Sequence, residues 1–291
     1  MKDFLQDFKK LVKLRLTLTV VFSASVAFLI GSKVQGDINW FNWVILTISG
    51  FLVTGSANGF NEIIERDLDK LMSRTADRPL PSGRMNTGQA LILSLFMGLI
   101  GTILLFRLNL LTGALSVFSI ILYAFVYTPI KQISPIAVFV GAFPGALPPL
   151  IGYFAAFDEP MISWIPIILF TIQFVWQFPH FWSIAWVLDE DYKRAGFRLL
   201  PTCKKDKVSA FMVIFSSMLL IPVGLLPTLM GFGGYVVGAL STLGGLVFVW
   251  YSWSLYKKLD TASAKKVMFT SFLYLPVVQL TLLFDFIPIS I

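Results

Sequence analysis

Charged residues are scarce in this chain of 291 residues: they make up 13% of it, against 56% apolar and 15% aromatic residues. Soluble domains carry about 25% charged residues, so this composition excludes an ordinary soluble protein and indicates a polytopic membrane protein. Cysteine occurs once, at Cys203, which excludes an internal disulfide and a thiolate metal cluster. No low-complexity linker interrupts the chain, so we expect residues 1–291 to form a single integral-membrane domain.

Long apolar segments recur along the chain, each able to cross about 30 Å of hydrocarbon as a helix of roughly 20 residues. They lack the alternating pattern of a lipid-facing barrel strand, so the sequence predicts an all-α bundle. We place nine transmembrane helices at 14–32, 42–60, 88–106, 111–127, 135–156, 162–186, 208–230, 235–256 and 266–286. Acidic clusters follow the second and the sixth of these predicted helices, four helices apart. This spacing favours a four-plus-four pseudo-repeat with a ninth helix appended.

Positive charge lies almost wholly on one side of these predicted helices. Every Lys and Arg except Lys33 and Arg107 falls in the N-terminal segment or in loops that share its side. The positive-inside rule then puts the N-terminus in the cytoplasm and the C-terminus outside. This topology explains the net charge of +7 without nucleic acid as a partner. An N-terminus without targeting character favours a prokaryotic plasma (inner) membrane over a mitochondrial one.

The first acidic cluster follows the second predicted helix and reads N-E-I-I-E-R-D-L-D over residues 61–69. Asn61, Glu65 and Asp69 are spaced i, i+4, i+8 and share one helical face, whereas Asp67 points roughly to the opposite side. An amide and two carboxylates suit Mg²⁺, which takes oxygen donors and shares its shell with substrate phosphates. The alternative is a solvated helix end stabilised by i, i+4 ion pairs.

Cations follow this cluster closely in the sequence. Arg74 and Arg78 come directly after the acids, and Lys131 lies in a short loop after Tyr127. Arginine forks bind phosphate oxygens in pairs, so the acids and cations together predict a diphosphate site. Taken singly, each arginine is also explained as a positive-inside loop residue.

The second acidic cluster, Asp189 to Asp191, ends a segment that contains His180, the only histidine. A continuous helix would separate His180 from Asp191 by about 16 Å, so the two cannot bind one metal. We expect Asp191 at the charged mouth with the first cluster, and His180 deeper, beside Trp176. An intramembrane histidine is either a functional residue or a hydrogen-bonded core residue, and both interpretations stay open.

Three motifs together resemble a known family. They are N-x-x-x-E-R-D-x-D-x-x-M-x-R-T-x-x-R-P-L at 61–80, Y-T-P-I-K at 127–131, and F-P-H-F-W at 178–182 followed by D-Y and A-G. This set is similar to the protohaem IX farnesyltransferases, or haem O synthases, of the UbiA-type superfamily of intramembrane prenyltransferases. One departure is Leu14, where proline is expected between two cations. Another is the presence of Asp189 and Glu190 before Asp191, which leaves open which acid serves the second metal site.

The resemblance implies a helical bundle around a central cavity, in which farnesyl diphosphate alkylates the vinyl group of haem B to give haem O. It implies Mg²⁺ as cofactor, farnesyl diphosphate and haem B as substrates, and membrane lipids, a haem A synthase or oxidase assembly factors as partners. The residues carried over are Asn61, Glu65, Asp67, Asp69 and Asp191 for the metal; Arg74, Arg78, Tyr127, Lys131 and Arg194 for the diphosphate; and Trp176, His180 and Trp182 for the haem. Asn61, Glu65, Asp69, Lys131 and Asp191 would form the catalytic set.

The residue types agree with this chemistry, although rival functions stay open. Ionising an allylic diphosphate requires fixed positive charge at the leaving group and a water-poor cavity. A UbiA-type enzyme acting on a quinone precursor or a chlorophyllide would share the bundle and the first metal motif. A transporter would place its charges mid-helix. His180 could ligate the haem iron, bond a propionate or accept a proton.

Overall fold

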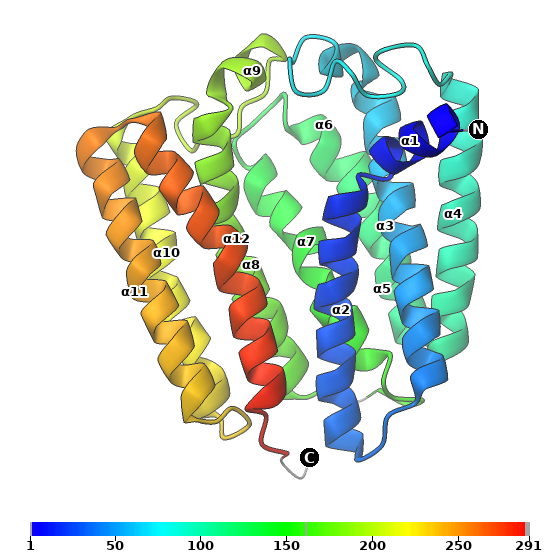
Figure 1. Cartoon of the computed structure of the whole chain (residues 1–291), viewed down its shortest axis with the longest axis vertical. Coiled ribbons are helices and arrows are strands. Elements are labelled where there is room, and N and C mark those ends of the chain that lie inside the picture. The colour runs from blue at the N-terminus through cyan, green and yellow to red at the C-terminus, as the bar shows by residue number, and fades with distance from the viewer. Residues whose placement is uncertain (1, 161, 289–291) are drawn as a thin grey trace.

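The computed structural model describes residues 2–160 and 162–288, without the side chains of residues 2 and 3. In these residues the regular structure is helical (Figure 1). The helices are α1 (Lys2–Leu11), α2 (Leu14–Gln35), α3 (Trp40–Asp69), α4 (Thr87–Leu108), α5 (Leu110–Ile120), the π-helix η1 (Ile121–Tyr127), α6 (Thr128–Ile130), α7 (Ala137–Phe154), α8 (Trp164–Val187), α9 (Asp189–Arg194), α10 (Lys207–Leu229), α11 (Tyr235–Lys258) and α12 (Thr261–Phe284).

The predicted multi-pass helical bundle is confirmed. Within the described residues, nine helical segments are long and apolar enough to cross a membrane, the fourth being α5, η1 and α6 together. The largest difference from the predicted spans is in α3, which continues to Asp69 where the predicted span stops at residue 60. With 30 residues α3 is about 45 Å long and exceeds the hydrocarbon core, so its acidic cluster lies on the last turns of a spanning helix.

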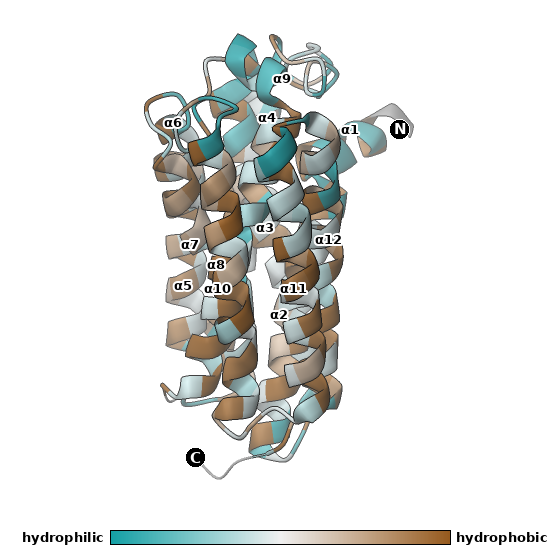
Figure 2. Ribbon diagram, turned by 90° about the vertical axis from the view of Figure 1, so that its left-hand side faces the viewer, coloured by the Kyte–Doolittle hydropathy of each residue, from teal (hydrophilic) through white to brown (hydrophobic). Residues whose placement is uncertain are grey.

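Polar residues gather at one end of the bundle, which carries α1, the loop 70–86, α6 and α9 (Figure 2). We call this the charged end; the C-terminal end of α12 lies at the opposite end (Figure 1). Between the two ends, large apolar side chains such as Phe96 and Trp250 are exposed on the helix surfaces. The chain is therefore an integral membrane protein. Both acidic clusters reach the charged end, as the pseudo-repeat expects, while the repeat itself stays a prediction.

Side-chain caps begin three of the helices that start at the charged end, α4, α10 and α12. Asn86 accepts a hydrogen bond from the backbone N–H of Gln89 (2.8 Å), and the Gln89 side chain accepts from the N–H of Asn86 (3.0 Å), which is a capping box. Asp206 and Asp260 accept in the same way at the starts of α10 and α12 (2.8 and 2.7 Å). These caps satisfy backbone donors that the first helical turn leaves free.

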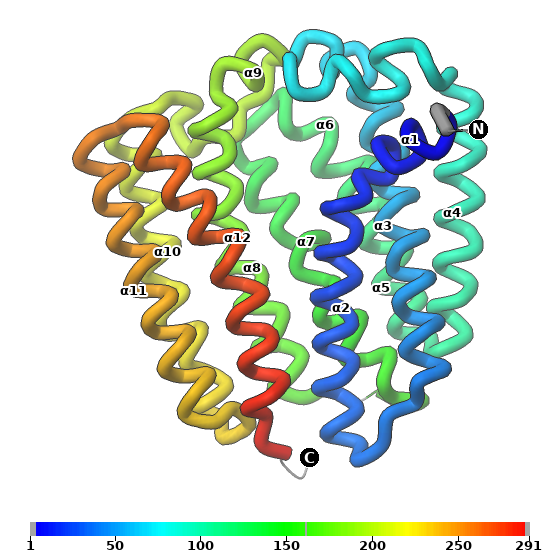
Figure 3. Tube along the Cα trace, viewed as in Figure 1, coloured from blue at the N-terminus to red at the C-terminus, as the bar shows by residue number. Residues whose placement is uncertain are grey.

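The α2 helix is held on two sides, by α7 and by α12 (Figure 3). At Gly152 of α7, a Cβ atom would lie 2.0 Å from the carbonyl oxygen of Ala24, so only glycine permits this approach to α2. On the other side, Ser23 donates to Gln173 (2.7 Å), and Gln279 donates to both (2.8 and 2.9 Å). This buried network joins α2, α8 and α12, and therefore segments near the two ends of the chain; the single domain stays a prediction.

Candidate active site

A widened helical turn brings the end of the fourth span against α3. Pro129 has no N–H to donate to the carbonyl four residues earlier, and its ring crowds that turn. The chain forms the π-helix η1 just before it, with the N–H of Thr128 bonded to the carbonyl of Tyr123. The Thr128 hydroxyl then accepts a hydrogen bond from the amide of Asn61 on α3 (3.0 Å).

The acidic cluster of α3 is buried, with Asn61, Glu65 and Asp69 on one face of the helix, as their spacing predicts. Asn61 donates to Glu65 (2.9 Å) and accepts from the ammonium of Lys13 (2.5 Å). Asp67 is different: its side chain is 66% exposed and pairs with Arg66 and Lys70. The structure therefore does not bring Asp67 to the cluster.

The two buried carboxylates on this face of α3, Glu65 and Asp69, each have a cation beside them. Glu65 forms an ion pair with Lys131, and Asp69 accepts from the guanidinium of Arg78 (2.7 Å). The second oxygen of Asp69, Oδ1, is buried and has no hydrogen-bond partner among the described residues. A buried carboxylate without a countercharge is strongly unfavourable, so each cation offsets part of the cost of burying the acid beside it.

Aromatic rings hold Lys131 in place. Its ammonium lies 5.0 Å from the ring centre of Tyr127 and 5.0 Å from that of Phe197, within reach of cation–π attraction. The carbonyl of Lys131 accepts from the N–H of Arg198 (2.8 Å), which ties the loop after α6 to the loop after α9.

Lys13 joins the cluster from the break between α1 and α2. Its backbone is left-handed (φ 49°), and this conformation separates the two helices. Burial, together with the nearby Arg78, lowers the pKa of Lys13 to about 7. An anion placed beside Lys13 would favour its charged form.

The second acidic cluster meets the loop that follows the first. The hydroxyl of Ser73 donates to both oxygens of Asp191 (3.0 and 3.1 Å), and Arg194 pairs with the same carboxylate. Although burial acts the other way, these two donors hold the pKa of Asp191 below its usual value. Asp189 is paired with Lys193 and the Glu190 side chain is 82% exposed, so Asp191 alone of the three contacts the loop 70–86.

The loop 70–86 also reaches α9 through Arg74. Its guanidinium carbon lies 6.0 Å from the ring centre of Tyr192, the neighbour of Asp191. Arg74 and Arg78 are thus both directed toward the acidic clusters, as expected of diphosphate-binding residues. Their proposed role stays a prediction.

A hydrogen bond to α12 holds one side of the His180 ring. Nδ1 of His180 lies 2.7 Å from the hydroxyl oxygen of Ser271, and which of the two atoms donates depends on the tautomer of the ring. The same hydroxyl oxygen lies 2.5 Å from the carbonyl oxygen of Met268. When Nδ1 carries the proton, Nε2 has a lone pair that can ligate a metal or accept a proton.

Two of the three predicted haem residues lie together. Trp176 stacks on His180 with 4.4 Å between ring centres and donates its N–H to the carbonyl of Ser271 (2.9 Å). Trp182 is buried against Phe178, and two residues along a helix place it on a different face from His180. The structure therefore does not bring Trp182 to the histidine.

The donor atoms fit a hard divalent ion that shares its coordination shell. Among the described residues, no three His, Cys, Asp or Glu side chains stand close enough to hold a metal by themselves. Asn61, Glu65 and Asp69 nevertheless offer oxygen donors, and Oδ1 of Asp69 is buried and unpartnered. Mg²⁺ prefers this situation, with one or two carboxylates and the rest of its shell from phosphate and water.

Comparison with known proteins identifies the family. Residues 20–275 match the UbiA prenyltransferase family. The chain is a member of that family. A protoheme IX farnesyltransferase of Cytophaga hutchinsonii is 46% identical over 96% of this chain and 97% of that protein. One of Christiangramia forsetii is 40% identical over 97% and 94%. Within the UbiA family, the chain belongs with these enzymes.

Solved structures show the same fold. A digeranylgeranylglyceryl phosphate synthase superposes with a TM-score of 0.80 at 20% identity, over 98% of this chain and 99% of that one. A UbiA homologue from Archaeoglobus fulgidus, bound to GPP and Mg²⁺, gives a TM-score of 0.70 at 14% identity, over 95% and 99%. At these identities the likeness concerns the fold alone.

Glu62 of this UbiA prenyltransferase has a role that sequence reasoning missed. Its side chain is buried, and Oε1 accepts from the backbone N–H of Leu80 (3.2 Å). This bond fastens the loop 70–86 to α3, and the same loop carries Arg78 to Asp69. The sequence feature that could have indicated this role was the position of Glu62, an acid next to Asn61 near the end of a membrane-spanning helix.

We predict that Glu62→Ala loosens this loop, because the buried N–H of Leu80 would lose its acceptor at a cost of about 1–3 kcal/mol. Trypsin should then cleave native protein after Arg74 several-fold faster, as measured by mass spectrometry of the peptides. Glu62→Gln keeps an acceptor and should resist cleavage like the unaltered protein. Equal cleavage of Glu62→Ala and unaltered protein would contradict the assignment.

Proposed function

We propose that this UbiA prenyltransferase transfers the farnesyl group of farnesyl diphosphate to the vinyl group of haem B, giving haem O and diphosphate. Protoheme IX farnesyltransferases match it over nearly their whole length, which supports this acceptor and donor. The observation that carries the proposal is the buried cluster of paired acids and cations where the two acidic segments meet. Such a cluster is suited to a polyanion accompanied by a divalent cation.

The residues of the cluster would change partners when the donor binds. Asn61, Glu65 and Asp69 would hold Mg²⁺, with Asp191 close to the shared diphosphate. Arg78 and Lys131 would turn from the carboxylates toward the diphosphate oxygens. When bound, Mg²⁺ supplies neutralisation of the charge that grows on the leaving diphosphate. Because the acids and cations already balance each other, metal and diphosphate should bind more tightly together than either does alone.

The surroundings would protect the farnesyl cation from water. The cluster lies at the end of an apolar bundle, and Tyr127 and Phe197 already place ring faces beside the Lys131 ammonium. Aromatic faces can stabilise a carbocation in the same way. No single ring is assigned this role, and the central cavity itself stays a prediction.

His180 would act on the haem side of the reaction. Nδ1 is hydrogen-bonded to Ser271, so Nε2 is the ring nitrogen left for the haem. Nε2 would ligate the haem iron, which we favour, bond a propionate, or accept a proton as water adds to the alkylated vinyl carbon. Iron ligation and proton acceptance need a lone pair on Nε2, which it has when Nδ1 carries the proton.

Sidedness and assembly belong to the same proposal. The distribution of Lys and Arg favours a cytoplasmic charged end and an outer C-terminus, in a plasma (inner) membrane. A haem A synthase or oxidase assembly factors would receive the product. The acids of both clusters lie at the charged end and not mid-helix, which disfavours the transporter alternative.

The reaction is tested by incubating purified protein with haem B, farnesyl diphosphate and Mg²⁺ and weighing the porphyrin product by mass spectrometry. We expect a product heavier than haem B by one farnesyl group and one hydroxyl group, the hydroxyl coming from water. Parallel incubations replace haem B with a quinone precursor or a chlorophyllide. Prenylation of either of these, with haem B unchanged, would refute the proposed acceptor.

The metal assignment predicts that Glu65→Gln and Asp69→Asn raise the Mg²⁺ concentration needed for half-maximal activity by roughly tenfold, about 1.4 kcal/mol, or more. Asp67→Asn is the matched control, because its side chain is exposed on the other side of the same helix. It should titrate like the unaltered protein. An unchanged magnesium titration in the first two variants, or activity in EDTA, would count against metal ligation by these acids.

Because His180 is assigned to the haem and the acidic cluster to the diphosphate, we predict that His180→Ala keeps farnesyl diphosphate binding and loses haem turnover. Binding is followed by calorimetry with the diphosphate, and haem ligation by the Soret band. His180→Ala should shift the Soret band of bound haem, because the iron loses its imidazole ligand. Ser271→Ala should cause a smaller shift in the same direction, because it removes the hydrogen bond that orients the imidazole and leaves the imidazole in place. If His180→Ala weakens diphosphate binding as much as haem turnover, the assignment is wrong.

A further inference from the structure

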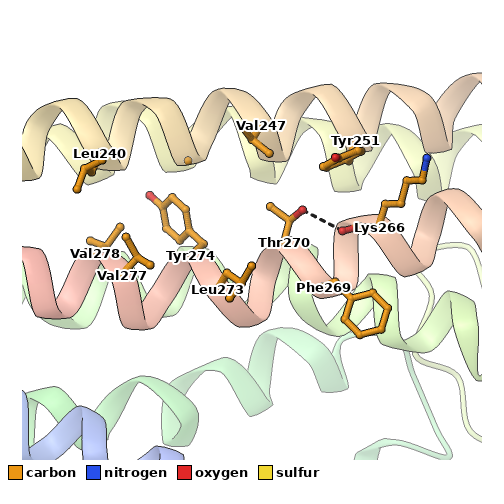
Figure 4. A pocket seen from close by; sticks show the side chains of 11 residues that line it. Leu240, Val247, Tyr251, Lys266, Phe269, Thr270, Leu273, Tyr274, Val277 and Val278 are labelled. Carbon is orange, nitrogen blue, oxygen red and sulfur yellow. Dashed lines mark hydrogen bonds between the residues drawn. The ribbon is translucent and has the colours of Figure 1, made fainter.

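An apolar groove runs between α11 and α12, on a side of the bundle that carries none of the candidate active-site residues. It has a volume of about 470 Å³ and is lined by both helices (Figure 4). Its apolar walls include Leu240 and Val247 on α11 and Leu273 and Val277 on α12. All four are exposed, so the groove opens to the surface that the membrane covers.

Two of the hydroxyl groups that line the groove are hydrogen-bonded within the protein. The hydroxyl of Thr270 donates to the carbonyl of Lys266 (2.9 Å), and that of Tyr274 donates to the carbonyl of Leu220 (3.3 Å). Gly244 adds no side chain in front of the Tyr274 ring, where a Cβ would lie 2.9 Å from it. The walls of the groove are therefore suited to an apolar chain.

A cation stands at one end of the groove. The ammonium of Lys266 lies 5.9 Å from the ring centre of Tyr251, and both residues line the groove (Figure 4). Within the part of the chain that the structure describes, Lys266 forms no ion pair with a carboxylate. Three more lysines, Lys257, Lys258 and Lys265, lie within ten residues of it at the charged end. This end of the groove is therefore suited to an anion.

The length of the groove matches one leaflet. On α12 its lining extends from Lys266 to Val278, which is roughly 18 Å of helix. Half of a hydrocarbon core of about 30 Å is about 15 Å. An amphiphile with its charge at Lys266 would thus extend to about the middle of the bilayer.

We propose that this groove binds one anionic phospholipid from the leaflet at the charged end, with an acyl chain along α11 and α12 and the phosphate at Lys266. Basic pockets between transmembrane helices bind anionic lipid head groups in this way. The apolar walls select an acyl chain, and the unpaired ammonium selects a negative head group over a neutral one. The site is independent of farnesyl transfer, because neither its residues nor its ligand belong to the active site.

The head-group contact is tested with purified, delipidated full-length protein in detergent, titrated with phosphatidylglycerol and observed by native mass spectrometry. We expect one tightly retained phosphatidylglycerol per chain and weak retention of phosphatidylcholine. Lys266→Ala should reduce retention roughly tenfold. Lys265→Ala is the matched control, since it removes the same charge one residue away and does not line the groove. Equal retention in the two variants, or equal retention of phosphatidylcholine, would overturn the proposal.

The acyl contact is tested by filling the groove. Val247→Trp places a bulky side chain in it, whereas Leu246→Trp adds the same ring to a neighbouring, equally exposed position outside it (46% and 51% exposed). We expect only Val247→Trp to lose the phosphatidylglycerol. A spectrum dominated by a dimer that Val247→Trp abolishes would show instead that a second copy of the chain occupies the groove.

Discussion

The arrangement depends on one electrostatic constraint: carboxylates buried at the end of an apolar bundle must be neutralised within the protein. Removing an ion from water costs several kcal/mol even after relaxation, and a close, hydrogen-bonded countercharge offsets that cost. Glu65 and Asp69 are neutralised by Lys131 and Arg78, which come from two other segments of the chain. The acids on α3 therefore decide where the loops at the charged end must lie.

The loops are fixed by contacts among themselves as well as by the ion pairs. Glu62 holds the backbone of the loop 70–86, and Ser73 of that loop holds Asp191. The carbonyl of Lys131 receives the N–H of Arg198, beyond α9. Three regions that are distant in sequence, residues 62–86, the loop after α6 and residues 191–198, thus position one set of charges. Such preorganisation lowers the reorganisation needed when a charged substrate binds.

The sequence predicted this site in part, and the difference has a physical origin. Helical spacing alone placed Asn61, Glu65 and Asp69 on one face and directed Asp67 away, because 3.6-residue periodicity is a local property. The nine spans followed from length and apolar composition in the same way. Family resemblance kept Asp67 in the metal set, but its exposed side chain pairs instead with neighbouring cations.

Contacts between distant segments were not predictable in this way. Lys13 is 48 residues from Asn61, and its approach depends on a left-handed residue between two helices and on how α2 packs against α3. Thr128 reaches Asn61 only through the widened turn before Pro129. No periodic pattern encodes such distances, because they follow from helix packing and from backbone geometry at single positions.

The buried bonds among Ser23, Gln173 and Gln279 restrict how a lipid chain could pass sideways into the bundle. Parting α2 from α12 at that depth would break the hydrogen bond from Gln279 to Ser23, at about 0.6–2 kcal/mol in a membrane. Between Ser23 and Lys13, toward the charged end, the described residues of α2 form no further side-chain hydrogen bond with α12. A lateral opening between α2 and α12 would accordingly form first at the charged end. A prenyl donor would then enter with its diphosphate head group first and its prenyl tail second.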